Sequence, residues 1–462
     1  MPGHKGGQGA PGLGVELFGP ALYGLDVSEM AGLDYLHSPS SALLAAQHSA
    51  AAVFGADRTF FLVNGATVGN LAAILAHAGE GAPVVIARNS HRSVYAGLVL
   101  SGAHPTYLPP VANRLLDGLF GIDLADLARA LDDDPTVAFV HVTSPSYYGF
   151  TLPLQAIVAI TSAAGVPLMV DEAHGSHFVF SDLLPASALE TGADVAVQSP
   201  HKTLGSLTQS SLLHVRGTRV DTERVGQVLQ MIQSSSPSAL LLASLELTID
   251  EMAREGARRW ERAVGLANSA RAAIGAIRGV AVHGEEVVGT PGVAGYDPCK
   301  LVVDVGGLGI SGPHAAAWLR SARGVNPEFS DLRRLVFSVT TGDDDSSVEI
   351  LIDALSELAT ADAARLGEGK PLIPRWPVAP PEIALTPRAG FAVPAQPLEL
   401  NDSLGKVAAE MVVPYPPGIP LLVPGEMVSQ AVVATIVQML EEGVHLVGMS
   451  DPSGRTLRCA TG

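Results

Sequence analysis

Apolar and polar positions along residues 58–215 predict short strands separated by helices. Runs rich in Val, Ile, Leu and Phe occur at "RTFFLV", "PVVIARN", "TVAFVHV", "VPLMVD", "DVAVQS" and "SLLHVR". Stretches with helical periodicity, such as "TVGNLAAILAHAG" and "PLQAIVAITSAAG", lie between most of them. Continuous apolar strands alternating with helices of about 10–15 residues are typical of βαβ units. We therefore predict an α/β fold with a mainly parallel sheet covered on both faces.

Further along the chain, the pattern predicts a long helix, a second α/β unit and a C-terminal unit. The long helical stretch runs from Ser238 to Ile274, and strand, helix, strand and helix patterns follow between residues 300 and 366. Eight prolines between Lys370 and Leu398 are too many for a core element and favour a linker or wrapping loop. The expected parts are an N-terminal arm at 1–25, a large domain at 26–265, a small α/β domain at 266–368, a proline-rich linker at 369–398 and a C-terminal α/β domain at 399–462.

Composition narrows the class of protein. The chain has 462 residues, 47% of them hydrophobic, so it can bury a large core, yet its apolar runs fall short of the roughly 18–20 residues of a membrane span. A net charge of −18 argues against nucleic acid as a partner and is compatible with a cationic small substrate. Cys299 and Cys459 form neither a metal spacing nor a disulfide framework. With no secretory signal in the sequence, we expect a cytoplasmic protein.

Two motifs match other ligand classes, and for both the structural interpretation is favoured. The stretch "GLGISG" (307–312) follows a strand, precedes a helix and has Asp331 about 20 residues later, as in a dinucleotide-binding turn. It occurs once and late in the chain, so a glycine-rich turn is the better interpretation. In "DEAHGSH", Asp171, His174 and His177 are competent metal ligands, but the glycine and the strand end argue against a shared face. We expect no metal.

A carboxylate and a lysine stand near the ends of two successive predicted strands. "VPLMVDEAHG" places Asp171 where a buried strand ends, and "DVAVQSPHKT" places Lys202 shortly after the next strand. Open α/β sheets bind ligands at the carboxyl ends of their strands, although a cap and a solvated charge are the alternatives. An acid and an amine in these places could hold a pyridine ring, the acid at the ring nitrogen and the amine as a Schiff base. The cofactor of that chemistry is pyridoxal 5′-phosphate.

This cofactor also needs a phosphate site, and "NGATVGN" (64–70) could supply one. Gly65 allows a sharp turn, after which Ala66 and Thr67 would present amide groups at a helix N-terminus, where the dipole favours an anion. In "RNSHRS", His91 follows another strand and could stack on an aromatic cofactor, or could be a hydrogen-bonded loop histidine. Each motif is weak alone, and the combination indicates the cofactor.

Together these motifs resemble the bacterial ornithine/lysine/arginine decarboxylases of the aspartate-aminotransferase fold type. Matching pieces cover nearly the whole chain in family order: "PGHKGG", "LDVSEMAGLDYLHSP", "FLVNGATVGN", "RNSHRS", "TSPSYYG", "DEAHG", "SPHKTLGSLTQ", "SSSPSALLLASLE" and "YPPGIPLLVPGE". The last piece is specific, since few other proteins carry it. Within the family, the chain is most similar to the shorter, arginine-decarboxylase-like branch.

The resemblance implies a role for each matching residue. Lys202 would form the Schiff base with pyridoxal phosphate, Asp171 would pair with the pyridine nitrogen, and His91 would stack on the ring. His174 would lie beside the reacting carbon. The residues implied for phosphate binding are Ala66, Thr67, Ser199 and His201. A homodimer or larger homo-oligomer is implied, and the serines that would reach a partner subunit's active site are Ser235 and Ser236, within "SSSPS" (234–238).

Three positions depart from the family pattern. The chain begins directly at "MPGHK", where relatives place an N-terminal arm, so the arm at 1–25 is expected to be shortened. Ala239 stands where an aromatic residue is common, which would reshape the pocket. Glu246 replaces a more usual aspartate, which is a mild change.

The implied activity is decarboxylation of a basic L-amino acid, with arginine favoured over lysine or ornithine. A distal guanidinium or ammonium would need a carboxylate, and the candidates are Glu426, Glu29 and Asp34, each of which could equally be a cap or a surface acid. Two alternatives stay open. One is another reaction at Cα, such as oxidation, deamination or transamination, on the same fold. The other is a non-catalytic regulatory relative, against which the presence of both Lys202 and Asp171 argues.

Overall fold

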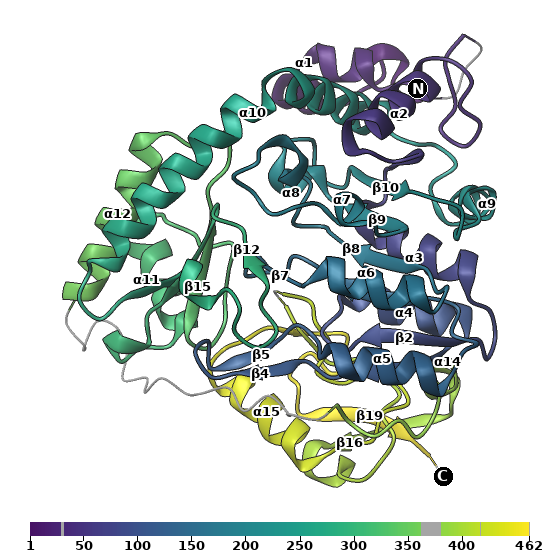
Figure 1. Cartoon of the computed structure of the whole chain (residues 1–462). Helices are drawn as coiled ribbons and strands as arrows, with labels where there is room; N and C mark the ends of the chain where they lie inside the picture. Colours follow the sequence, from purple (N-terminus) through teal and green to yellow (C-terminus); the bar gives the residue numbers. More distant parts are fainter. Residues whose placement is uncertain (29–31, 362–379, 416, 462) are drawn as a thin grey trace.

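The computed structural model describes residues 1–28, 32–361, 380–415 and 417–461 (Figure 1). A seven-stranded sheet with the order β1-β10-β9-β8-β6-β2-β3 lies at its centre. Neighbouring strands from β9 to β3 run parallel, whereas β10 is antiparallel to both β9 and β1. The mainly parallel α/β sheet expected from the sequence is thus confirmed. Its strands are β1 (Arg58–Leu62), β2 (Pro83–Ala87), β3 (His104–Leu108), β6 (Val140–Thr143), β8 (Leu168–Asp171), β9 (Val195–Gln198) and β10 (Ser211–Val215).

Helices cover both faces of this sheet, because its strands are apolar on both sides. In β2, Val84 and Ile86 join one buried core with α3, α4 and α9, while Val85 and Ala87 join another with α5 and α6. Such two-sided burial is typical of parallel sheets. Because β9, β8, β6 and β2 run parallel, their carboxyl ends lie at one common edge of the sheet. The helices of this domain are α2 (Ala42–Phe54), α3 (Gly65–His77), α4 (Arg92–Ser101), α5 (Leu124–Asp133), α6 (Leu154–Ala163), α7 (Ala188–Thr191), α8 (Pro200–Thr203) and α9 (Thr222–Ile232).

The second part of the structure begins with a long helix. It was predicted after residue 238, and the structure confirms it as α10 (Ala239–Gly275). It leads to an antiparallel sheet with the order β11-β13-β15-β14, which lies beside the large sheet in Figure 1. Leu301 and Leu335 of this sheet share a core with Ala267 of α10. The other elements of this part are β11 (Ala281–His283), β13 (Lys300–Asp304), α11 (Gly312–Arg323), β14 (Phe329–Ser330), β15 (Arg334–Ser338) and α12 (Asp345–Thr360).

The glycine-rich stretch 307–312 is a structural turn in this antiparallel sheet. Its strand, β13, pairs with β15 in antiparallel fashion, whereas a dinucleotide site needs a parallel βαβ unit. A Cβ atom at Gly312 would lie 2.1 Å from the carbonyl oxygen of Asp331, so the glycine is needed for close packing. The Asp331 carboxylate accepts hydrogen bonds from the Tyr148 hydroxyl at 2.7 Å and from Arg334 Nη1 at 3.0 Å. Close packing therefore explains Gly312 of this motif, and these hydrogen bonds explain the position of Asp331.

The C-terminal part packs below the large sheet in Figure 1 and differs from expectation in one respect. Residues 380–398, predicted as linker, contain a helix that Thr386 caps and Pro387 starts, since proline is tolerated at the first helical position. Arg388 of this helix donates a hydrogen bond to the Val99 carbonyl of α4 at 2.9 Å, which attaches the segment to the large domain. The elements here are α14 (Pro387–Ala392), β16 (Ala395–Glu399), β17 (Val413–Pro414), α15 (Gln430–Glu441), β18 (Leu446–Val447) and β19 (Thr456–Ala460).

The N-terminal residues form helix α1 (Gly12–Leu25), at the end of the molecule opposite the C-terminus (Figure 1). Small two-stranded pairings complete the structure: β4 (Val111–Asn113) with β5 (Gly118–Phe120), and β7 (Phe150–Thr151) with β12 (Gly295–Tyr296). Within the described ranges, no helix combines the length and apolar character that crossing a membrane requires. The domain boundaries given above stay a prediction.

Candidate active site

The strand order brings Asp171 and Lys202 to the same edge of the large sheet. Asp171 is the last residue of β8, and it lies opposite Val197 of the parallel neighbour β9. After β9 the chain turns into the short helix α8, which carries Lys202. Asp171 is 3% exposed, so its carboxylate lies at the floor of the site. The carboxyl ends of parallel strands are the expected place for a ligand.

The Lys202 amine faces two side chains of neighbouring loops. Its Nζ atom lies 3.1 Å from His174 Nε2 and 5.7 Å from the centre of the Tyr147 ring. The Lys202 side chain lines an open cavity, so part of its surface is exposed to solvent. Its amine is nevertheless largely desolvated by the surrounding protein atoms. This desolvation lowers the pKa of Lys202, against the opposing effect of Asp171. A lowered pKa makes the neutral, nucleophilic amine more accessible.

Asn70 and a backbone amide orient the Asp171 carboxylate. Asn70 Nδ2 donates to Asp171 Oδ2 at 2.9 Å, and the Ala173 amide donates to Asp171 Oδ1 at 3.2 Å. The same Asn70 amide group lies 3.0 Å from Ser93 Oγ, which in turn lies 2.9 Å from His91 Nδ1. One buried asparagine therefore connects the acid with the histidine that follows β2.

His91 is held between this network and the C-terminal part of the chain. A Cβ atom at Gly418 would lie 3.0 Å from His91 Cδ2, and the Arg92 amide donates to the Gly418 carbonyl at 2.9 Å. Burial lowers the pKa of His91 to about 4, with Asp171 opposing the shift and Lys202 adding to it. The imidazole is therefore neutral at physiological pH, as a ring that stacks on an aromatic ligand should be.

The start of α3 has the properties of an anion site. Gly65 adopts a φ of 72°, which a residue with a side chain rarely tolerates, and the N-cap Asn64 makes no side-chain cap to the helix. The Gly65 amide donates to the Gln209 carbonyl at 2.8 Å, whereas the next two amide groups of the helix, at Ala66 and Thr67, have no side-chain cap, and Thr67 is exposed. An anion of ligand size would satisfy them.

The two residues of the 199–201 stretch that were expected to bind phosphate have protein partners in the structure. Ser199 is fully buried, with its Oγ atom 3.4 Å from Ser211 Oγ. His201 Nδ1 lies 2.6 Å from the Ser210 carbonyl, and burial lowers the pKa of this half-buried histidine. Their phosphate contacts stay a prediction.

The residues present fit pyridoxal phosphate in two respects. A buried carboxylate and an amine of lowered pKa lie at adjacent strand ends, as a pyridine nitrogen and an aldehyde require. A helix N-terminus without a side-chain cap offers donors to a phosphate. Asp171, Lys202, His91 and the start of α3 could therefore hold the cofactor together.

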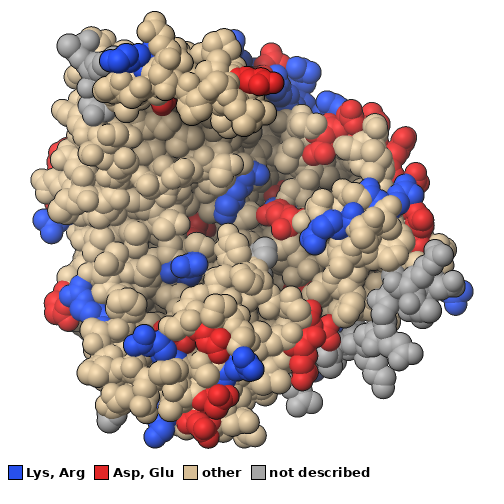
Figure 2. All heavy atoms as spheres, turned by 180° about the vertical axis from the view of Figure 1, so that it is seen from behind, with Lys and Arg blue, Asp and Glu red and all other residues tan. Residues whose placement is uncertain are grey.

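The antiparallel sheet contributes a second charged group, which the sequence did not indicate. Glu328 Oε1 lies 3.5 Å from His174 Nδ1, and Glu328 Oε2 accepts hydrogen bonds from Lys300 Nζ and Ser338 Oγ. A cavity of about 470 Å³ has both Lys202 and Glu328 among its lining residues. Figure 2 shows a recess near the middle of one face with blue and red side chains beside each other.

Among the carboxylates considered for binding a basic substrate, Glu426 is already engaged by the protein, which corrects the expectation for this residue. Glu426 is 1% exposed, and Arg88 donates to both of its oxygens, from Nε and from Nη2, each at 2.9 Å. The Val423 amide also donates to Glu426 Oε2 at 2.9 Å. A carboxylate whose two oxygens are already occupied has no free fork for a second guanidinium. Glu426 instead attaches the C-terminal part to the loop between β2 and His91.

Asp34 is likewise occupied by local structure, and Glu29 lies outside the described residues. The Asp34 carboxylate accepts hydrogen bonds from four backbone amides, which lower its pKa although desolvation acts in the opposite direction. These donors are the amides of Ser40, Ser41, Leu43 and Tyr35. Asp34 therefore organises the loop before α2, which is the cap alternative that the sequence left open.

The serine segment lies on the surface between two stretches of its own subunit. Ser235 and Ser236 are exposed, and the Tyr35 hydroxyl donates to the Ser235 carbonyl at 3.3 Å. The Ser234 amide donates to Asn64 Oδ1 at 3.2 Å, beside the start of α3. The contribution of this segment to a partner subunit stays a prediction.

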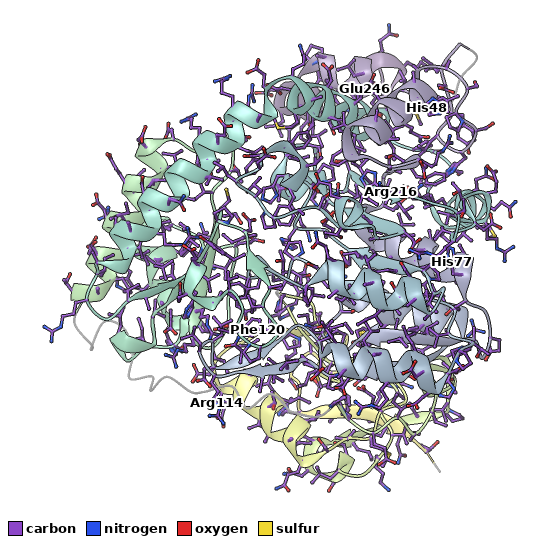
Figure 3. All side chains as sticks on the ribbon, viewed as in Figure 1. His48, His77, Arg114, Phe120, Arg216 and Glu246 are labelled. Carbon is purple, nitrogen blue, oxygen red and sulfur yellow. The ribbon has the colours of Figure 1, made fainter. Side chains whose placement is uncertain are left out.

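Glu246, one of the departures from the family pattern, is exposed on α10 and labelled near the top of Figure 3.

Asp171, His174 and His177 do not form a metal site in this structure. His174 faces Lys202, while His177 Nε2 lies 3.1 Å from Asp297 Oδ2, in a pair that is 1% exposed on both sides. Across the described part of the chain, no group of three or more His, Cys, Asp and Glu residues has the geometry to hold a metal ion.

The structure adds four residues to the site that the sequence analysis did not assign. Asn70 and Tyr147 lie inside motifs already noted, "NGATVGN" and "TSPSYYG", so their position in the motif was the available signal. Glu328 and Lys300 lie in no such motif, and only the packing of the two sheets brings them near Lys202. The only signal for Lys300 in the sequence is that lysine is rare, with five lysines in the whole chain. The structure then shows that Lys300 is buried, at 3% exposure.

Comparison with known proteins identifies related sequences along nearly the whole chain. Residues 1–347 match the family described as Orn/Lys/Arg decarboxylase, major domain, and residues 379–448 match the C-terminal domain of the same family. An arginine decarboxylase of Halalkalibacterium halodurans is 37% identical over 99% of this chain and 93% of its own length. An arginine decarboxylase of Bacillus subtilis is 36% identical with the same coverage.

Solved structures agree on the fold. The lysine decarboxylase LdcF of Francisella novicida superposes with a TM-score of 0.87 at 20% identity, over 99% of this chain and 78% of that one. The constitutive lysine decarboxylase of Escherichia coli gives 0.84 at 22% identity, over 100% and 79%. A serine palmitoyltransferase structure with pyridoxal phosphate matches 70% of this chain and 77% of its own, with a TM-score of 0.54 and 17% identity. The fold is therefore that of the aspartate-aminotransferase type.

Proposed function

The chain belongs to the Orn/Lys/Arg decarboxylase family, and from this premise we propose that it decarboxylates L-arginine to agmatine and CO2 with pyridoxal phosphate as cofactor. The choice of arginine over lysine or ornithine is supported by the curated arginine decarboxylases, which match at 36–37% identity over nearly the full length. The observation that carries the proposal is the pairing of a buried carboxylate, Asp171, with an amine of lowered pKa, Lys202, at adjacent strand ends.

Pyridoxal phosphate, when bound, supplies an electron sink for the electron pair that loss of CO2 leaves on Cα. Asp171 would keep a proton on the pyridine nitrogen, which is the charge state that makes the ring an effective sink. The hydrogen bonds from Asn70 and the Ala173 amide hold the carboxylate in one orientation for this purpose. Lys202 would bind the cofactor covalently and give way to the substrate's α-amine.

The remaining residues hold the reactants in place and move protons. His91, neutral and covered by Gly418, would pack against the ring face, and the start of α3 would bind the phosphate. After CO2 has left, a proton must reach Cα, and Lys202 Nζ and His174 Nε2, 3.1 Å apart, are the groups placed to supply it. The C–C bond to the carboxylate breaks, the electron pair stays on Cα, and the proton replaces the carboxylate there.

Reduction with borohydride tests the assignment of the lysine. The purified protein with its cofactor should acquire a permanent label on Lys202 alone, which peptide mass analysis detects. Lys300 is an internal control, because it lies near the same site but is engaged by Glu328 and Ser338. A label on Lys300, or the absence of any label, would contradict the assignment.

A further inference from the structure

Three strands of the antiparallel sheet bring one carboxylate to the edge of the Lys202 cavity. Lys300 and Ser338 lie opposite each other on β13 and β15, and Lys300 Nζ donates to Ser338 Oγ at 2.7 Å. Glu328 lies just before β14, and its amide donates to the Val336 carbonyl of β15 at 2.8 Å. Lys300 and Ser338 then both donate to Glu328 Oε2. The backbone and both donors thus fix the direction of the carboxylate.

The second oxygen of this carboxylate faces His174. Glu328 Oε1 lies 3.5 Å from His174 Nδ1, a buried atom with no hydrogen-bond partner in the described residues. On the other side of the ring, His174 Nε2 lies 3.1 Å from Lys202 Nζ. The ring of Tyr147 packs against the imidazole with 4.7 Å between ring centres, which limits its rotation. The imidazole therefore stands between a carboxylate and an amine.

The donors and acceptors on the two sides allow only one neutral tautomer. An ionised carboxylate only accepts hydrogen bonds, so the nitrogen facing Glu328 must carry the hydrogen. The nitrogen facing Lys202 is then left with a lone pair, which can accept a proton from the lysine ammonium. Burial, together with the charges of Lys202 and Lys300, keeps the pKa of His174 well below its usual value, so the ring is neutral at rest.

Resting on the proposed function, we propose that Glu328 is a positioning residue that fixes His174 as the Nδ1–H tautomer, so that Nε2 exchanges a proton with Lys202. In the forward direction, the Lys202 ammonium gives a proton to Nε2 and becomes a neutral amine. The imidazolium that forms lies beside the Glu328 carboxylate, which stabilises its positive charge. In reverse, the same proton returns to Lys202, and no further reactant is needed.

The variant Glu328→Gln tests this with almost no change in shape. Lys300 and Ser338 both act as donors toward Glu328 Oε2, so they would hold the amide oxygen on that side. The amide NH₂ would then face His174 Nδ1 and require a lone pair there, which switches the ring to the Nε2–H tautomer. Asp343→Asn is the matched control, because it removes another carboxylate from the lining of the same cavity without a contact to His174.

NMR of the full chain labelled with nitrogen isotope in histidine reads the tautomer directly, without substrate or cofactor. The signals of His174 are those lost in His174→Gln. We expect Nδ1–H in the wild type and in Asp343→Asn, and Nε2–H in Glu328→Gln. An Nε2–H tautomer in the wild type, or no change in Glu328→Gln, would overturn the proposal.

Steady-state kinetics with arginine provides the second measurement. In Glu328→Gln, kcat should fall by a factor on the order of 10² while KM changes little, because the lost function is proton transfer. A rise in KM at constant kcat would instead make Glu328 a substrate ligand and overturn the proposal. If the wild type shows the Nδ1–H tautomer but does not release CO2 from any basic amino acid, the proposed reaction fails while the tautomer assignment stands.

Discussion

For single residues, the proposed chemistry depends on how Asp171 and Lys202 are held and not on their presence alone. Asn70 orients the acid, and His174 contacts the amine at 3.1 Å. The sequence could predict Asp171 and Lys202, because each stands just after an apolar run that ends at the same edge of a sheet. It could not predict Glu328 and Lys300, whose relation to Lys202 exists only after two sheets have packed together.

The variant Asp171→Asn should keep the cofactor but lose most of the activity. An amide in place of the carboxylate cannot hold the ring nitrogen protonated, so the electron sink weakens while the binding contacts remain. We expect kcat to fall by a factor on the order of 10²–10⁴, with a much smaller change in KM. Steady-state kinetics and a cofactor assay measure the two effects. A kcat near that of the wild type would remove the proposed role of Asp171.

At the scale of elements, the packing of the C-terminal part on the large domain is the feature that the sequence described least well. Its motif "YPPGIPLLVPGE" is recognisable in the sequence, from which Glu426 was only one of three candidates for a carboxylate that binds the substrate. In the structure Glu426 pairs with Arg88, and Gly418 covers His91. The strands of the large sheet, by contrast, were predictable because their apolar runs are continuous. The helix α14 was missed because proline was taken to exclude a helix that it in fact starts.

Removing Glu426 should therefore reduce stability. Glu426→Ala leaves the buried Arg88 guanidinium without its partner, which costs about 3–5 kcal/mol in the free energy of unfolding. The double variant Arg88→Met with Glu426→Leu removes both charges and should recover most of that loss. Denaturant unfolding followed by circular dichroism compares the variants. A single variant within about 0.5 kcal/mol of the wild type would show that the pair does not attach the C-terminal part.

At the scale of the whole molecule, the single chain exposes an apolar helix. No residue of α1 is buried, and Leu17 and Phe18 are 69% and 63% exposed. Monomeric proteins rarely expose contiguous apolar surface of this kind. We therefore propose a homodimer in which a second copy covers α1 and the serine segment 234–238 reaches the partner's site.

A charged residue on α1 should disrupt this homodimer. Phe18→Asp is expected to shift the protein toward monomers and to lower its activity, because burying the new carboxylate at an apolar interface is costly. Phe391→Asp is the control, since Phe391 is equally exposed, at 64%, but lies on α14. Sedimentation analysis gives the oligomeric state. Fully active monomers of the wild type at low concentration would contradict the proposal.

Product analysis with a panel of amino acids is the decisive measurement of the proposed reaction. The protein with its cofactor is incubated separately with L-arginine, L-lysine and L-ornithine, and the products are identified by mass. We expect arginine to be converted fastest, to agmatine with release of one CO2 per molecule. Faster conversion of lysine or ornithine would contradict the substrate, and products that retain the carboxylate, or no product at all, would contradict the reaction.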